Sequence, residues 1–240
     1  MLFRSGDPRL EHLDELDRLW VGLRTRTVFP AHPVRGLLGF LGRENSLVSS
    51  GSLRRLLHRQ VRFTRLEDAA IPIGIPVTEV TTGREEMLRA GDAVQAVLAS
   101  AAIPGVFPPV TIDGRAFIDG SIVNNVPIEP AVEDGATEIW VLATGYACNL
   151  ERPPRGALAM ILHAVSLLVQ QRLIRDVEEF GERVALRVIP PLCPLDVSPA
   201  DFSQARALID RAEAAANAWI DHLDPRVGVE QARDLGFHRH

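Results

Sequence analysis

The hydrophobic and polar positions along the chain follow two different periods, which predict helices and strands in alternation. Leucines three or four residues apart follow the Gly6-Asp7-Pro8 start signal and are typical of an amphipathic helix. The same period predicts helices over residues 93–102, 157–180 and 200–223. Short runs rich in β-branched residues predict strands at 71–82, 138–143 and 184–189. This alternation of strands and helices indicates an α/β fold.

Turn and cap residues add a hairpin to these elements and locate the start of one helix. The pair Asp113-Gly114 stands between Val110–Ile112 and Arg115–Ile118, a pattern typical of a β-hairpin with a two-residue turn. Asp92 precedes the run AVQAVLASAA and is expected to cap that helix. Residues 24–65 carry short apolar groups broken by Gly and Pro, which predict a loop with one or two short helices.

Composition narrows the class of protein. The chain has 240 residues, 46% of them hydrophobic and 24% charged, as in an ordinary globular protein of one or at most two domains. All 26 basic residues are arginine, and 31 acidic residues outnumber them to give a net charge of −5. Nucleic acid is therefore not an expected partner. The lack of lysine excludes lysine-based catalysis, including Schiff bases.

Cysteine usage and hydropathy bear on the compartment. Cys148 and Cys193 stand far apart, so neither a disulfide framework nor a zinc site is indicated, and we expect no metal and no cofactor. The longest apolar stretch, Ala157 to Val169, is shorter than the roughly 20 residues that a bilayer span requires, and no secretory signal begins the chain. We expect a cytoplasmic protein.

One of three Asp-Gly pairs has the context of a reactive group. Asp113 and Asp134 are explained as turn residues. Asp119 instead ends an apolar strand and is followed by the small pair Gly120-Ser121. A glycine at that place lets two backbones approach closely, and partial desolvation raises the basicity of a carboxylate toward that of a general base. Such an aspartate could deprotonate a serine.

The residues around Asp119 also resemble a known family. The segments Ala96–Val110, Asp113–Arg115 and Phe117–Pro127 are similar to the second half of patatin-like phospholipases, and Val77–Gly83 and Asp14–Phe29 add to the resemblance. The resemblance implies an α/β/α sandwich around a mainly parallel sheet. It also implies lipid acyl-ester hydrolysis by a Ser-Asp dyad, and therefore a lipid or other acyl-ester substrate and possible contact with a membrane surface.

The resemblance assigns roles residue by residue. Asp119 would be the general base, and Gly120, Ser121 and Asn125 would shape its loop. The family has Ala or Gly where this chain has Ser121, which we do not take for the nucleophile. Asn124 and Asn125 could equally bond their own turn.

Two other parts of the family's machinery do not occur in these residues. The sequence contains neither a GxSxG nucleophile elbow nor a GGGxxRG-type oxyanion loop. We therefore expect an N-terminally truncated, incomplete patatin-like domain over residues 1–223, a tail over 224–240, open apolar surface, and little or no esterase activity from this chain alone. The alternatives are a non-catalytic module that binds lipid, a membrane or a protein partner, and a split enzyme whose serine comes from another chain.

A last group of candidates has simpler explanations beside the functional ones. Ser49, Ser50 and Ser52 are more typical of a helix cap than of a nucleophile. The arginines at 54, 55, 59, 62 and 65 could meet a lipid headgroup or could form a solvated helix face.

Overall fold

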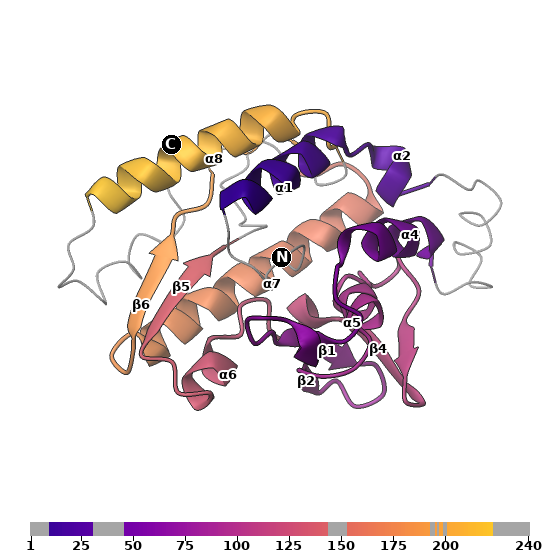
Figure 1. Ribbon diagram of the computed structural model, residues 1–240, viewed down its shortest axis with the longest axis horizontal. Helices are drawn as coiled ribbons and strands as arrows, with labels where there is room; N and C mark the ends of the chain where they lie inside the picture. Colours follow the sequence, from indigo (N-terminus) through magenta and orange to yellow (C-terminus); the bar gives the residue numbers. More distant parts are fainter. Residues whose placement is uncertain are drawn as a thin grey trace. The chain divides into compact units, whose positions relative to one another are not determined.

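The computed structural model describes residues 10–30, 46–143, 153–192, 195, 197–198 and 201–222 (Figure 1). The chain forms two compact units. The first is Met1–Val123 with Val197–Arg206, and the second is Asn124–Asp196 with Ala207–His240. The predicted tail at 224–240 lies outside the described residues.

The first unit is built on a four-stranded antiparallel sheet with the strand order β2-β1-β4-β3. Its strands are β1 (Ile75–Glu79), β2 (Glu85–Leu88), β3 (Val110–Ile112) and β4 (Arg115–Asp119). The predicted hairpin is confirmed as the β3–β4 pair. Its turn residues Asp113 and Gly114 both have positive φ, 49° and 76°, as a two-residue type I′ turn requires.

Four helices accompany this sheet in the described residues of the first unit, and α5 (Ala93–Ser100) is the one that packs directly on its strands. The others are α1 (Leu10–Gly22), α2 (Thr25–Val28) and α4 (Gly51–Gln60), with 3₁₀ turns η1 (Leu66–Asp68) and η2 (Gly120–Ile122). Helix α5 lies against β1 and β4 and meets α4 on its other side. Phe117 of β4 is 1% exposed and packs in one core cluster with Val77, Leu98 and Leu57. This core holds the carboxyl end of β4 in place, because strand, helix and neighbouring helix share buried side chains.

The second unit holds a parallel strand pair joined through a long helix. Its elements are α6 (Ile128–Glu133), β5 (Glu138–Leu142), α7 (Ala157–Phe180), β6 (Ala185–Ile189) and most of α8 (Ala205–Asp221). Strands β5 and β6 pair in parallel, which requires a crossover, and α7 supplies it. One face of α7, including Leu173 and Val177, packs with Val141 of β5 and Leu186 of β6 in a second core.

The predicted α/β class is confirmed, and the pairing of the strands is more mixed than the resemblance implied. Within the described residues three strand pairs are antiparallel and one is parallel, so the sheet content there is not mainly parallel. The reason is that short turns join β1 to β2 and β3 to β4, and a short turn can link only antiparallel neighbours. The sequence pattern did not predict β2 and η1, which are short and lack a clear period.

Helix α5 offers a test of local stability. Asp92 is its N-cap, and its Oδ1 accepts the backbone N–H of Gln95 at 2.8 Å, as predicted. We expect Asp92→Ala to lower the free energy of unfolding by about 1 kcal/mol, because the N–H loses its partner. Urea denaturation measures this change. Asp68→Ala is the matched control, since the Asp68 side chain makes no hydrogen bond with any described residue; equal losses in both variants would contradict the capping role.

Candidate catalytic site around Asp119

The backbone of Asp119 is fixed from two sides. Asp119 is the last residue of β4 and stands opposite Val77 of β1 in the ladder. Its N–H donates to the carbonyl of Ala102, just after α5, at 3.1 Å. Its carbonyl oxygen accepts the hydroxyl of Thr78, a residue only 3% exposed, at 3.0 Å. The side chain therefore starts from a backbone position that sheet and helix determine together.

The carboxylate of Asp119 is held by the turn that follows it. Its Oδ1 accepts the N–H of Ser121 at 2.8 Å and so caps η2. Burial raises the pKa of Asp119 above its usual range, although the N–H and the side chain of Ser121 pull this pKa down. A carboxylate offers about four lone-pair positions, and the Ser121 N–H occupies one of them. A partly buried carboxylate with lone pairs left over is suited to accept a proton as a general base.

Gly120 is required by a close approach of two main chains. A Cβ built on Gly120 would lie 2.3 Å from the carbonyl oxygen of Pro76 and 2.5 Å from its carbonyl carbon. Those atoms are backbone of β1, so they cannot rotate out of the way. The contact explains why the residue after the aspartate is glycine, and it sets the direction in which the chain leaves β4.

The other residues of the predicted loop fall into different settings. Ser121 is half-buried and supplies the N–H to Asp119. Asn124 and Asn125 belong to the second unit, where Asn124 is 1% exposed and Asn125 is half-buried. Asn125 makes no side-chain hydrogen bond with any residue that the structure describes. The two asparagines are thus unequal, and Asn124 is the one that the fold buries.

Thr78 is a site residue that no sequence motif indicated. It lies in the middle of an apolar strand, where a hydroxyl needs an acceptor, and the Asp119 carbonyl is that acceptor. Its period-2 neighbour Pro76 is the residue that Gly120 touches. A polar residue inside a buried strand was the available signal, but the pairing of β1 with β4 could not be read from it.

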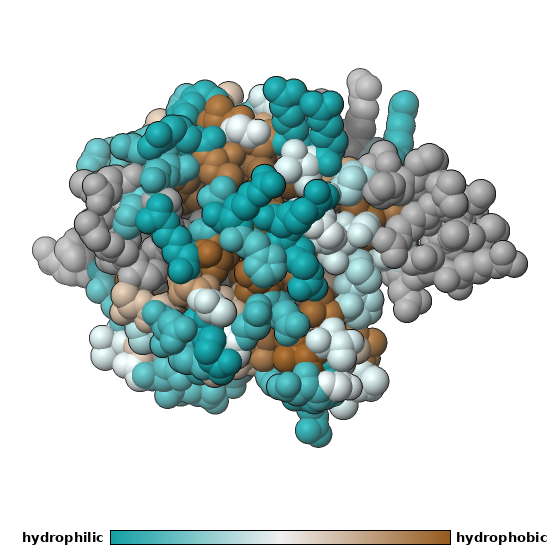
Figure 2. Space-filling view, turned by 45° about the vertical axis from the view of Figure 1, so that its right-hand side comes forward, coloured by the Kyte–Doolittle hydropathy of each residue, from teal (hydrophilic) through white to brown (hydrophobic). Residues whose placement is uncertain are grey.

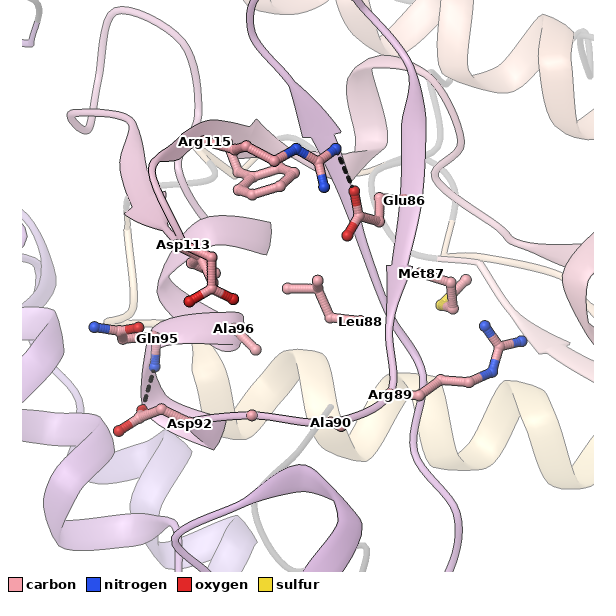
Figure 3. A pocket seen from close by; sticks show the side chains of 13 residues that line it. Glu86, Met87, Leu88, Arg89, Ala90, Asp92, Gln95, Ala96, Asp113 and Arg115 are labelled. Carbon is pink, nitrogen blue, oxygen red and sulfur yellow. Dashed lines mark hydrogen bonds and ion pairs between the residues drawn. The ribbon is translucent and has the colours of Figure 1, made fainter.

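A pocket lies elsewhere in the first unit, and Asp119 is not among the residues that line it. This pocket of about 260 Å³ is bounded by β2, the start of α5 and the β3–β4 hairpin (Figure 3). Three of its charged groups have structural partners: Arg115 pairs with Glu86 at 2.5 Å, and Asp92 caps α5. These lining residues therefore stabilise the sheet and α5, and we assign the pocket no catalytic role.

The remaining candidates add no second catalytic group in the described residues. Ser49 Oγ accepts the Gly51 N–H at 3.3 Å, next to the start of α4, while Ser50 at the N-cap position makes no side-chain cap bond. Cys148 and Cys193 lie outside the described residues. Where the structure describes the chain, no cluster of three or more His, Cys, Asp or Glu residues could hold a metal ion. In the same residues, no helix combines the length and apolar character of a membrane span.

Comparison with known proteins finds similarity to patatin-like phospholipases and to proteins named as lysophospholipases. The model of the family described as patatin-like phospholipase matches residues 2–132. Lysophospholipase NTE1 of Cryptococcus neoformans var. neoformans is 32% identical over 100 residues, which are 42% of this chain and 6% of the relative. Patatin-like phospholipase domain-containing protein 6 of Homo sapiens is 26% identical over 102 residues, 42% of this chain and 7% of the relative. An uncharacterised NTE family protein of Mycobacterium bovis is 35% identical over 65 residues, 27% of this chain and 18% of that protein. The matched part therefore spans less than a fifth of each of these relatives.

The contact between Gly120 and Pro76 can be tested by adding one methyl group. We expect Gly120→Ala to lower the free energy of unfolding by about 1–3 kcal/mol or more, because the new Cβ meets fixed backbone atoms. Gly22→Ala, at the end of α1, is the control, since nothing lies within 4 Å of its added Cβ. Chemical denaturation of both variants measures the difference. A Gly120→Ala protein as stable as the control would contradict the close approach.

Two carboxylates of the sheet should give opposite pH dependences of stability. The folded pKa of Asp119 lies above its ordinary value of 3.8, so its contribution destabilises the fold progressively as pH rises through that pKa. The pKa of Glu79 is lowered from 4.5 to about 2, mainly by hydrogen bonds from Arg115 and Thr82, so its stabilising contribution is complete above about pH 4.5 and is lost as pH falls toward 2.

Asn and Gln substitutions remove these titrations one at a time. Relative to the wild type, we expect Asp119→Asn to gain stability as pH rises above 4 and Glu79→Gln to lose stability between about pH 2 and 4.5. Urea midpoints measured across this range give both curves. If stability changed with pH in the same direction in both variants, the opposite pKa shifts of Asp119 and Glu79 would be contradicted.

Proposed function

Because the chain belongs to the patatin-like phospholipase family, we propose that it carries the general-base half of a lipid acyl hydrolase, with Asp119 as the base of a Ser-Asp dyad. The observation that carries the proposal is the setting of Asp119. Its backbone is fixed by Thr78 and Ala102, its carboxylate is oriented by Ser121, and burial raises its pKa. A base needs all three properties: a fixed position, an oriented lone pair and an increased affinity for a proton.

The nucleophile of this reaction would come from outside the 240 residues. The sequence holds no GxSxG elbow, and acyl transfer requires a serine within hydrogen-bond reach of its base together with donors for the developing oxyanion. In the proposed reaction, Asp119 takes the serine proton as the serine oxygen attacks the ester carbonyl. It returns the proton to the leaving alcohol, and water then hydrolyses the acyl-serine. The chain alone would show little or no esterase activity.

Exposed apolar side chains on the second unit support the proposal that this unit contacts protein or lipid. Leu142 on β5 is 72% exposed and Leu168 on α7 is 70% exposed, with Ile161 at 60%. Figure 2 shows apolar side chains at the surface between hydrophilic ones. Large exposed apolar side chains on a strand and on a helix of one unit offer apolar surface to a partner or to lipid. The same observation favours the second candidate function, a non-catalytic patatin-fold module that binds lipid or protein.

The proposed substrate class follows from the relatives. Two of them carry lysophospholipase or phospholipase in their names, so we propose an acyl ester of a phospholipid or lysophospholipid as substrate. A cytoplasmic location with peripheral contact to a membrane is part of the same proposal, because such a substrate resides at a lipid surface.

The catalytic proposal is tested on the gene product isolated from its native source. Its intact mass is compared with the 26.3 kDa of this chain. A heavier product that contains GxSxG is assayed for hydrolysis of lysophosphatidylcholine. We expect Asp119→Asn to lower kcat/KM by about 10²–10⁴, because the serine loses its base. Asp113→Asn is the matched control, since Asp113 belongs to a different Asp-Gly pair, in the turn between β3 and β4, and Asn tolerates its positive φ.

Two results would count against catalysis by Asp119. One is hydrolysis by the Asp119→Asn protein at the rate of the Asp113→Asn control. The other is a native mass equal to that of Met1 to His240 together with binding of lysophosphatidylcholine vesicles but no turnover, which would favour the binding module.

A further inference from the structure

The outer side of α4 forms a small basic pocket with α2. The pocket has a volume of about 160 Å³ and is lined by Thr27, Ser52, Arg55, Leu56 and Arg59. All five residues belong to the first unit, and none lies on β1, β4 or η2, the elements that form the Asp119 site. A water molecule takes about 30 Å³ in the liquid, so the pocket has room for a small tetrahedral anion with water around it.

The sequence of α4 separates an inner apolar side from this outer basic side. Leu57 is 2% exposed and packs in the core with residues of β1 and α5, and Leu53 packs against the same cluster. Arg55 and Arg59 are one helical turn apart and exposed, so both project from one face of the helix. Packing of the leucines therefore fixes the orientation of α4, and with it the side of the helix from which the two arginines extend.

The two arginines differ in how far their donors are used. Arg55 donates from Nε to the Gly51 carbonyl at 3.3 Å and from Nη2 to Ser52 Oγ at 3.2 Å, which leaves most of its five N–H donors for another acceptor. Arg59 makes no hydrogen bond or ion pair with any residue that the structure describes. Bonds from Arg55 to the first turn of α4 hold one guanidinium in place while the second remains available.

The two charged residues that line the pocket are both arginines. Segments 24–30 and 46–66 contain seven arginines and no acidic residue, in a chain whose net charge is −5. Two of these arginines have carboxylate partners: Arg62 lies 3.8 Å from Glu15, and Arg65 lies 2.7 Å from Glu67. Neither Arg55 nor Arg59 pairs with a carboxylate within the described parts of the chain. Within the described residues, the pocket is therefore lined by positive charge that no carboxylate pairs with.

We propose that this pocket binds a phosphate group, either that of a phospholipid headgroup or a free phosphate. Guanidinium groups match the geometry of phosphate oxygens and can bind them in pairs of N–H···O bonds. The hydroxyls of Thr27 and Ser52 add neutral donors, and Leu56 forms an apolar wall beside them. Ser52 also lies in the first turn of α4, where the helix end is partly positive. The proposal goes beyond the acyl hydrolase function, because it concerns binding at a site that Asp119 does not share.

The test compares two phosphate sources in binding assays without hydrolysis. Titration calorimetry follows inorganic phosphate, and flotation follows phosphatidylcholine vesicles with and without phosphatidic acid. The variant is Arg55→Gln with Arg59→Gln, and Arg84→Gln in the exposed turn between β1 and β2 is the control of matched type. We expect the double variant to bind at least about tenfold more weakly than the wild type and the control, because it loses two charge-assisted contacts.

The outcomes separate the sources and can overturn the proposal. Binding to phosphatidic acid vesicles that the double variant loses identifies a lipid headgroup, whereas loss of inorganic phosphate binding without vesicle binding identifies a free phosphate. Equal binding of both probes by wild type and double variant, or no binding by the wild type, would overturn the proposal. Equal melting temperatures of all variants ensure that the loss is local. Because no step depends on the serine or on Asp119, the result stands apart from the outcome for ester hydrolysis.

Discussion

The close packing of Gly120 against the Pro76 carbonyl is the constraint on which the Asp119 site depends. It brings the start of η2 onto the main chain of β1, so that the chain must turn immediately after β4. That turn places the Ser121 N–H over the Asp119 carboxylate. Because backbone atoms form the contact, a side-chain rearrangement elsewhere cannot compensate for it. The direction of the aspartate is therefore built into the sheet.

The surroundings give neighbouring carboxylates of this sheet opposite electrostatic properties. Glu79 on β1 is bonded to Arg115, which also bonds Glu86 on β2, and its pKa falls to about 2. Asp119 on β4 has no arginine partner among the described residues, and burial raises its pKa. Glu79 is thus kept as a charged structural group, while Asp119 is kept able to gain a proton. Environment, rather than residue type, separates the structural acid from the candidate base.

Each unit leaves a different kind of surface open. In the first unit, α4 turns its leucines inward and presents Arg55 and Arg59 to solvent. In the second unit, consecutive residues of β5 point to opposite faces of the strand: Val141 is buried, and Leu142 is 72% exposed. The basic surface of the first unit suits an anionic group, and the apolar surface of the second unit suits an apolar partner, each taken by itself.

The sequence by itself determined the local features whose causes are local. The helix cap at Asp92 and the hairpin turn at Asp113-Gly114 each follow from a few adjacent residues, and the structure places both as predicted. The α/β class and the long helix α7 followed from periods that many residues share. Resemblance to the family pointed to Asp119, since its signal is a contiguous run of residues.

Only the tertiary structure decided how distant segments meet. The pairing of β1 with β4 brings Thr78 and Pro76 to Asp119 and Gly120 across some forty residues, and no local pattern encodes that register. It likewise decided that β2 completes an antiparallel sheet, that Asn124 rather than Asn125 is buried, and that α2 closes a pocket over the arginines of α4. The physical reason is that burial depends on atoms that are close in space but distant in sequence. The pKa of a carboxylate and the need for a glycine at a close contact depend on the same atoms.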